Sequence, residues 1–134
     1  MSSQNNFEKQ FCNYDISKAL KELGFNEDCL GCFDPEIGRL VLGDLEDYFN
    51  YNIPENLVYA PLYQQVIDWF REKHNIHIVI EDHTFVDVIN DGSGYKYYID
   101  VYGCTEVGRS EFINTYYEAR EQAILKAIEL IKEK

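Results

Sequence analysis

The segment 115–134 at the C-terminus constrains the fold of this chain more than any other. Thr115 followed three residues later by Glu118 is the pattern of a capping box, which predicts that a helix begins there. The apolar residues that follow recur at helical spacing and are mostly small near the start: Ala119, Ala123, Ile124, Ala127, Ile128 and Ile131. Such a stripe suits close packing on a sheet, so we expect a fold that layers helices on strands.

Two more helices are expected earlier in the chain. The first has Asp15 as its predicted N-cap and ends at Gly24, because glycine adopts the left-handed conformation that closes a helix. The second begins near Pro61 and runs to about His74, with apolar residues at helical spacing along its length. Asn75 is the residue expected to end it. Each apolar face needs a partner layer.

Strand patterns lie between these helices as two hairpins. Residues 30–33 and 39–42 are short apolar segments on either side of a turn-rich stretch, which predicts the first hairpin. Alternating apolar residues over 76–89 and 95–102 predict the second. The run 90–94, Asn-Asp-Gly-Ser-Gly, is the clearest turn signal in the chain and joins these two segments.

Together these patterns indicate an α+β fold in the order α-ββ-α-ββ-α. We expect a mainly antiparallel sheet of about four strands covered by three helices. The length of 134 residues fits one domain spanning 1–134, with 1–12 as a flexible N-terminus. The N-terminal residues lack the pattern of a signal peptide and no apolar run is long enough for a membrane span, so we expect a soluble cytoplasmic protein with no membrane contact.

Charge is the second constraint, and it concerns function. The chain has 24 Asp and Glu against 12 Lys and Arg, a net charge of -12, while 46% of its residues are hydrophobic and 15% aromatic. That apolar content is typical of a folded protein, so the acidic residues lie on a folded surface. Residues 26–68 carry nine carboxylates and only one cation, Arg39. Such a surface repels phosphate backbones and attracts basic partners.

The most acidic part of that region also contains tyrosines, which are enriched at binding surfaces. We therefore expect a non-catalytic interaction protein that binds a basic protein partner, as a mimic of nucleic acid, and that uses no cofactor. The alternative for the tyrosines is that they fill the margin of the core. The predicted partner-binding residues are Asp44, Glu46, Asp47, Tyr48 and Tyr51.

Metal chemistry is the other function that the residues raise, as part of a small hydrolase or metal-dependent enzyme that uses clustered carboxylates and histidines. Cys29 and Cys32 have the C-x-x-C spacing of zinc and redox sites, but the chain has no second pair to complete a zinc site. Packed, reduced thiols are the simpler interpretation. His77 and His83, with Glu81 between them, would share one face of an extended strand and hold a metal there.

Motifs over most of the chain carry a resemblance to a known group of proteins: Lys21–Phe25, Cys29 with Gly31, Ala60–Pro61, Trp69–Lys73 and Tyr116–Ala119. The chain resembles small uncharacterised proteins encoded in the genomes of gut bacteria and their bacteriophages. That group has no assigned function, so the resemblance implies no activity. It implies a phage or mobile-element setting.

The part from Pro61 onward is also similar in its order of elements to the double-stranded RNA-binding domain. In that domain the final helix begins with a basic segment whose lysines contact phosphates. Here Glu118, Arg120 and Glu121 stand at the corresponding place. The resemblance therefore implies a shared order of elements without RNA binding.

We expect the isolated protein to show no appreciable affinity for duplex DNA or RNA at near-physiological salt. The reason is that its net charge opposes binding driven by the release of counterions from the nucleic acid. A mobility-shift assay with each duplex measures this affinity. Micromolar binding to either duplex contradicts the prediction.

Overall fold

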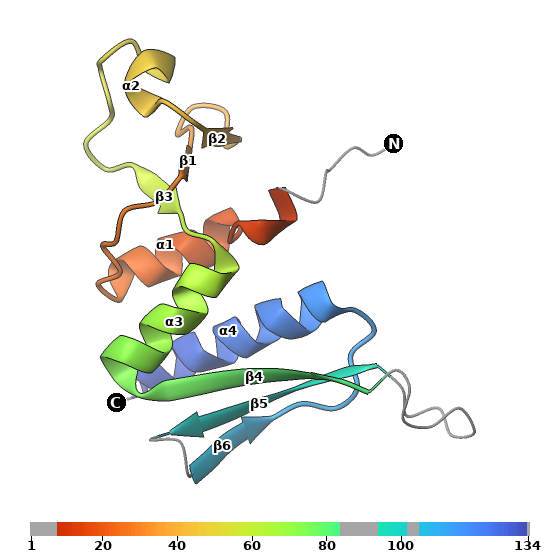
Figure 1. The fold of residues 1–134 in the computed structure, drawn as a ribbon. Helices are drawn as coiled ribbons and strands as arrows, with labels where there is room; N and C mark the ends of the chain where they lie inside the picture. The colour runs from red at the N-terminus through yellow and green to blue at the C-terminus, as the bar shows by residue number, and fades with distance from the viewer. Residues whose placement is uncertain (1–7, 84–93, 102–104, 134) are drawn as a thin grey trace. The chain divides into compact units, whose positions relative to one another are not determined.

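A computed structural model describes residues 8–83, 94–101 and 105–133. The chain divides into two compact units, Met1–Tyr63 and Gln64–Lys134, which we call unit 1 and unit 2. Over the described residues the fold contains two antiparallel sheets of three strands each and four α-helices (Figure 1). The expected α+β class is therefore confirmed. The expectation of a single domain stays a prediction.

Unit 1 is built from short elements around a small sheet. Its strand order is β2-β1-β3, and the central strand β1 pairs antiparallel with both neighbours. The elements of unit 1 in chain order are η1 (a 3-10 helix, Glu8–Gln10), α1 (Tyr14–Glu22), β1 (Gly31–Phe33), β2 (Leu40–Leu42), α2 (Leu45–Tyr48) and β3 (Val58–Ala60).

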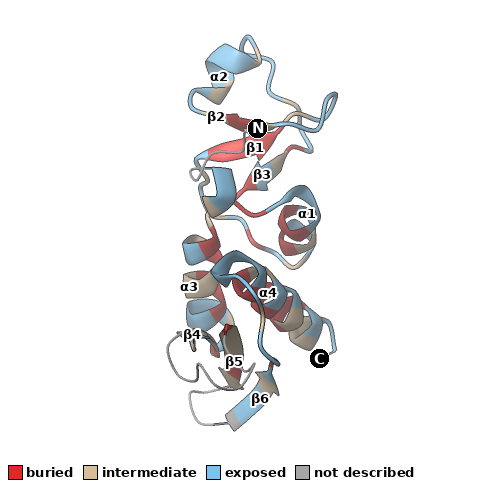
Figure 2. Ribbon diagram, turned by 90° about the vertical axis from the view of Figure 1, so that its right-hand side faces the viewer, coloured by how far each residue is buried: buried red, intermediate tan, exposed pale blue. Residues whose placement is uncertain are grey.

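Both faces of β1 are buried (Figure 2). Phe33 belongs to an apolar cluster with Phe11 and Ala60. The preceding residue, Cys32, points to the opposite face of the strand, as alternation along a strand requires, and belongs to a second cluster with Val41 and Leu57. Unit 1 therefore has apolar packing on both sides of its sheet.

Phe11 and Cys12, at the end of the expected flexible N-terminus, are packed within unit 1. Phe11 and Cys12 are only 4% and 1% exposed. Phe11 forms an isolated β-bridge with Leu62, and the Cys12 N–H donates to the carbonyl of Pro61 at 2.9 Å. The Phe11 side chain joins the first apolar cluster, so this end of the segment is packed. The expectation of a flexible N-terminus over 1–12 stays a prediction.

Unit 2 is a three-stranded antiparallel meander with the order β4-β5-β6. Its elements are α3 (Tyr63–His74, which begins at the last residue of unit 1), β4 (Ile76–Asp82), β5 (Tyr95–Val101), β6 (Thr105–Arg109) and α4 (Tyr116–Lys132). Helix α4 contacts β4 and β5. It buries the expected small apolar stripe, including Ala119, Ala123 and Ala127, and Ile99 of β5 is fully buried. The predicted packing of this helix on a sheet is confirmed.

Local signals located several elements correctly. Thr115 is the N-cap of α4, and its Oγ1 accepts a hydrogen bond from the Glu118 N–H at 3.1 Å. Asn75 has a φ of 53°, the left-handed conformation expected after α3. At α1 the N-cap is Asn13 rather than Asp15, because the Asn13 side chain accepts from the Ile16 N–H at 2.9 Å. Asp15 instead lies in the first turn, where an acidic side chain is also favourable.

The expectation of one sheet of about four strands was wrong, since the structure has two separate sheets of three. Strands β3 and β6 lie at 58–60 and 105–109, where no strand was expected. Each was missed because it is short and is stabilised by pairing with a partner strand, β1 or β5.

The fourth helix, α2, has only four residues. The strand pattern at 85–89 and most of the turn 90–94 lie outside the described residues.

Helix α3 gives a direct test of the packing in unit 2. Phe70 is fully buried and Trp69 is 4% exposed, so Phe70 is the deeper of the two. We expect Phe70→Ala to lower the free energy of unfolding by about 3–5 kcal/mol, because it leaves a cavity in a packed core. Urea denaturation of the full chain measures this change.

The matched control is Glu72→Ala on the same helix, whose side chain is exposed. We expect this variant to stay within about 0.5 kcal/mol of the original protein. Losses of similar, small size for both variants would show that α3 is not packed as described.

Candidate functional site

The predicted acidic and tyrosine residues lie on α2 and on the turn that follows it. Leu45 and Phe49 pack against the second apolar cluster of unit 1, which anchors this segment to the sheet. The side chain of Asp44 caps the helix by accepting from the Asp47 N–H at 3.2 Å. Glu46 and Asp47 are exposed. The apolar side of the segment is thus partly buried while its acidic side faces water.

Tyr51 is the most exposed tyrosine of this segment, at 76%. It follows α2 with a φ of 64°, and the preceding Asn50 has a φ of 54°. Two consecutive residues in the left-handed region close the helix, and the Tyr51 N–H donates to the carbonyl of Glu46 at 2.6 Å. This conformation is unfavourable for a bulky residue such as tyrosine. Tyr51 nevertheless adopts this conformation, and its side chain is exposed to solvent.

Tyr48 connects α2 to the β1–β2 turn. Its hydroxyl donates to Asp34 Oδ2 at 2.8 Å, and Asp34 Oδ1 accepts from the Glu36 N–H at 2.9 Å. The bond from the Glu36 backbone, followed by the one from Tyr48, lowers the pKa of Asp34 below its usual value. The same Asp34–Tyr48 bond raises the pKa of the Tyr48 hydroxyl. At neutral pH the carboxylate is therefore charged, the phenol is protonated, and the bond fixes the ring.

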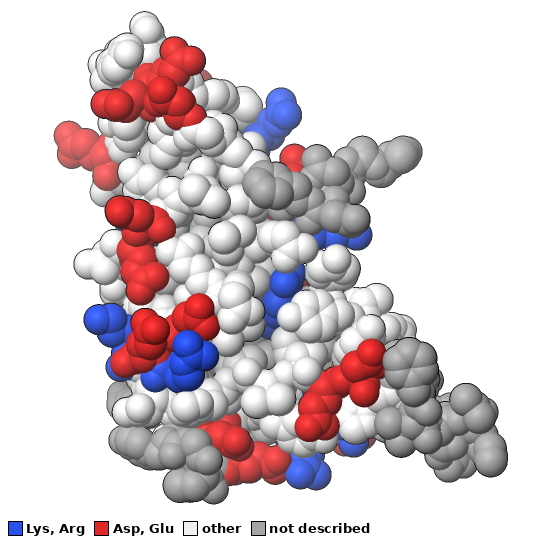
Figure 3. Space-filling view, in the orientation of Figure 1, with Lys and Arg blue, Asp and Glu red and all other residues white. Residues whose placement is uncertain are grey.

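The carboxylates of this segment lack ion-pair partners in the described part of the chain, although the charge of Arg39 acts on the neighbouring Tyr48. Asp44, Glu46 and Asp47 form no ion pair with any residue in the described part of the chain. Acidic side chains gather over α2 in Figure 3. Several acidic residues of unit 2 do have cationic partners: Asp68 with Arg71, Glu106 with Arg109, and Glu129 with Lys126.

We call Asp34, Glu46, Asp47, Tyr48 and Tyr51 the α2 surface. The structure brings together four of the five residues expected to bind a partner and gives the fifth, Asp44, a capping role. Asp34 is the residue that sequence reasoning missed. It lies 14 positions before Tyr48, and no local pattern predicts a hydrogen bond over that separation. The turn signal at 34–38 placed Asp34 in a turn without indicating its partner.

The two cysteines of the C-x-x-C sequence occupy different environments. Cys32 is fully buried in β1, whereas Cys29 is half-buried in the preceding loop, where its thiol donates to the Glu27 carbonyl at 3.3 Å. Burial, followed by the charges of Glu27 and Asp28, raises the pKa of Cys29 to about 11. Burial also raises the pKa of Cys32. Zinc binding and redox attack require thiolates, and this environment favours thiols instead.

The two histidines of the expected metal site are separated along β4. His77 lies opposite Asp100 in the β4–β5 pair, while His83 follows the end of β4 and places Nε2 3.0 Å from Glu81 Oε1. Six residues of extended chain span about 20 Å, so one ion cannot bind both rings. Within 8–83, 94–101 and 105–133 no group of three His, Cys, Asp or Glu side chains is placed to hold a metal.

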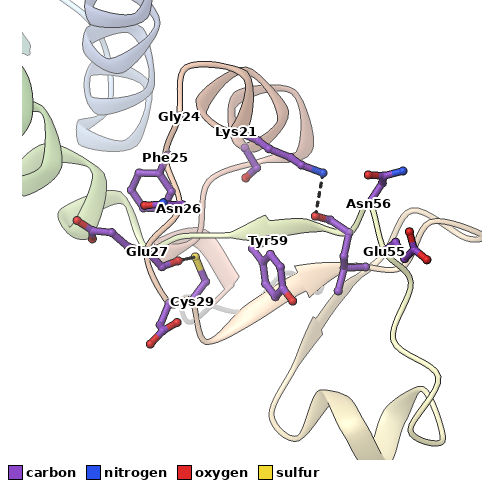
Figure 4. Close-up of a pocket in the computed structure, with 12 residues that line it drawn as sticks. Lys21, Gly24, Phe25, Asn26, Glu27, Cys29, Glu55, Asn56 and Tyr59 are labelled. Carbon is purple, nitrogen blue, oxygen red and sulfur yellow. Dashed lines mark hydrogen bonds between the residues drawn. The ribbon is translucent and has the colours of Figure 1, made fainter.

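Unit 1 also contains a pocket of about 670 Å³ that the sequence did not reveal. It lies at the C-terminal end of α1, between the loop 24–29 and the segment 55–59 (Figure 4). Lys21 extends from α1, and its Nζ donates to the carbonyl of Leu57 at 3.2 Å. The pocket is lined by charged, polar and apolar side chains, among them Phe25, Glu27, Asp28, Cys29, Glu55 and Tyr59.

Comparisons with protein-family models, with curated proteins and with solved structures find no match to this chain. The order α3-β4-β5-β6-α4 of unit 2 is the one that the similarity to the double-stranded RNA-binding domain implied. Helix α4 nonetheless begins without lysines, and the Arg120 side chain near its start is 5% exposed. In the part of the chain that the structure describes, no helix has the length and apolar character needed to cross a membrane.

The environment of Cys29 can be measured by its reactivity. Because burial and two neighbouring carboxylates disfavour the thiolate, we expect the rate of alkylation by iodoacetamide to be still rising at pH 10. Mass spectrometry of the modified peptide separates Cys29 from the other cysteines. The paired substitutions Glu27→Gln and Asp28→Asn should shift the profile to lower pH. A midpoint near pH 8.5, that of an ordinary exposed thiol, contradicts the prediction.

Proposed function

We propose that this chain is a non-catalytic interaction protein whose α2 surface binds a basic protein partner. One observation carries the proposal: exposed carboxylates that form no ion pair with any described residue lie beside two exposed tyrosines, Tyr48 and Tyr51. Complementary charge accelerates the encounter with a positive partner. Tyrosines add contact area with little loss of conformational freedom, so they act as anchors once the partner is bound.

The conformation of Tyr51 supports the same function. Selection for stability alone favours glycine or asparagine at a left-handed position, whereas here a tyrosine is exposed. Unfavourable backbone conformations are typical of sites where a side chain must be presented in a set orientation. Docking of the Tyr51 ring on a partner gives a reason for that conformation.

The finer version of the proposal is a mimic of nucleic acid. The α2 surface then occupies the groove in which a basic partner binds DNA or RNA, and its carboxylates take the place of phosphates. The net charge of -12 supports this version. This version also includes a cytoplasmic location and an origin in a phage or mobile element. The resemblance to proteins of gut bacteria and their bacteriophages supports that origin.

No specific observation favours the hydrolase alternative. The three histidines lie in unit 2, outside the pocket of unit 1, and the carboxylates of Asp28 and Glu55 at that pocket belong to exposed residues. General acid–base catalysis needs titratable groups that converge within hydrogen-bond reach of a substrate. Among the described residues, no group of three His, Cys, Asp or Glu side chains is placed to hold a metal for such an enzyme.

The test of the proposal uses variants of α2 with a partner isolated by affinity capture from the host. Glu46→Lys with Asp47→Lys should slow association several-fold and weaken its dependence on salt, because these side chains supply the attraction. Asp44 is left in place because it caps α2. Surface plasmon resonance measures both rates.

A matched control reverses two exposed carboxylates of unit 2, Glu72→Lys with Glu111→Lys, and so has the same net charge. If the control slows association as much as the α2 variant does, the slower association is caused by the change in net charge, and the α2 surface is not the interface. For the mimic version, an oligonucleotide bound by the partner should compete with the protein. Simultaneous binding of both would reject that version alone.

Tyr51→Gly separates stability from binding. Glycine relieves the left-handed conformation at this position, so we expect a free energy of unfolding within about 1 kcal/mol of the original or higher. We also expect dissociation from the partner to be at least tenfold faster, since an anchor ring is lost. Unchanged dissociation would remove Tyr51 from the interface.

A further inference from the structure

We propose that the pocket at the C-terminal end of α1 binds a cationic group carried on an aliphatic stem, the chemistry shared by arginine and lysine side chains and by polyamines. Its volume of about 670 Å³ lies within the range of about 300–1,000 Å³ that ligand pockets occupy. The pocket does not include the α2 surface, so this proposal and the proposed function can fail separately.

The charge of the lining favours a cation. Glu27, Asp28 and Glu55 contribute three carboxylates, while Lys21 contributes the one ammonium group of the lining. The ammonium already donates to the Leu57 carbonyl. The pocket also lies at the C-terminus of α1, where the helix dipole adds negative potential. The carboxylates of the lining and the dipole of α1 both favour the binding of a cationic group.

The pKa of the Cys29 thiol, in the same lining, also indicates a negative electrostatic potential in the pocket. A negative potential disfavours a thiolate, and the charges of Glu27 and Asp28 raise the pKa of Cys29 beyond the effect of burial, which is the larger cause. The same charges that disfavour an anion at Cys29 favour a cation beside it. The charges of the lining and the raised pKa of Cys29 thus indicate the same sign of ligand.

The apolar residues of the lining provide a surface on which the aliphatic stem of the ligand can pack. Phe25 and Leu57 are buried, at 9% and 3% exposure, and supply carbon surface. Tyr59 is 43% exposed and lines the pocket, and an aromatic ring face attracts a cation. An alkyl chain packs on such a surface while its charged end stays near the carboxylates, as lysine and arginine side chains commonly do.

The test uses small probes on the full chain followed by nuclear magnetic resonance. N-acetyl-arginine methylamide should shift the backbone amide signals of Asn26, Asn56 and Tyr59, with a dissociation constant on the order of 1 mM. N-acetyl-norleucine methylamide is the uncharged control and should cause shifts at least fivefold smaller at equal concentration. Equal shifts from both probes, or none from the arginine probe at tenfold higher concentration, would overturn the proposal.

Matched variants separate the pocket from overall charge. Asp28→Asn with Glu55→Gln removes two exposed carboxylates of the lining and should weaken binding of the arginine probe about three- to tenfold. Asp15→Asn with Glu36→Gln removes two exposed carboxylates of unit 1 outside both the lining and the α2 surface and should leave binding unchanged. Equal weakening in the two variants would show that the probe senses net charge alone, which overturns the pocket.

Spermidine distinguishes the two sources of the ligand. Tighter binding of spermidine than of the arginine probe, lost in the same Asp28 and Glu55 variant, identifies a free polyamine as the ligand class. Tighter binding of the arginine probe identifies a side chain of a protein. Either result supports a cation pocket, and binding that does not respond to the variant for either probe overturns it.

Discussion

The pairing of β1 with both β2 and β3 is the interaction on which unit 1 depends. It requires a glycine at position 31, because a Cβ there would lie 2.6 Å from Leu42 Cδ2 and 2.9 Å from the Val41 carbonyl oxygen. The pairing positions the Asp34 turn next to Tyr48, the last residue of α2, so that the Tyr48 hydroxyl reaches Asp34. It also sets the segment 55–59 beside the loop 24–29, which forms the pocket. Both candidate sites thus follow from three short strands.

The acidic character of the chain takes different forms in its two units. Carboxylates of unit 2 form exposed ion pairs, such as Glu106 with Arg109, and such pairs contribute little to stability. On the α2 surface, Glu46 and Asp47 have no such partners among the described residues. The α2 surface and unit 2 therefore differ mainly in electrostatic surface potential, and little in the stability that their charges contribute. That difference is what a positively charged partner or ligand would detect.

Elements with a strong local signal were predicted well from the sequence. The capping residues and small apolar stripe of α4, the apolar spacing of α3 and the alternation in β4 are each encoded by neighbouring residues. Strands β3 and β6 were missed because short segments become strands only when a partner offers a ladder of hydrogen bonds. The division into two sheets was missed for the same reason, since pairing between strands joins residues far apart in the sequence.

By itself, the sequence determined the α+β class, the excess of carboxylates and the segment in which acids and tyrosines concentrate, because composition and local periodicity carry that information. Only the tertiary structure decided which of those acids cap a helix and which face water. It also decided that His77 and His83 lie far apart and that Asp34 bonds to Tyr48. The pocket at the end of α1 arises from three segments that meet only after β1 and β3 pair. The physical reason is that a site depends on distances between side chains, and those distances are set by long-range packing and strand register.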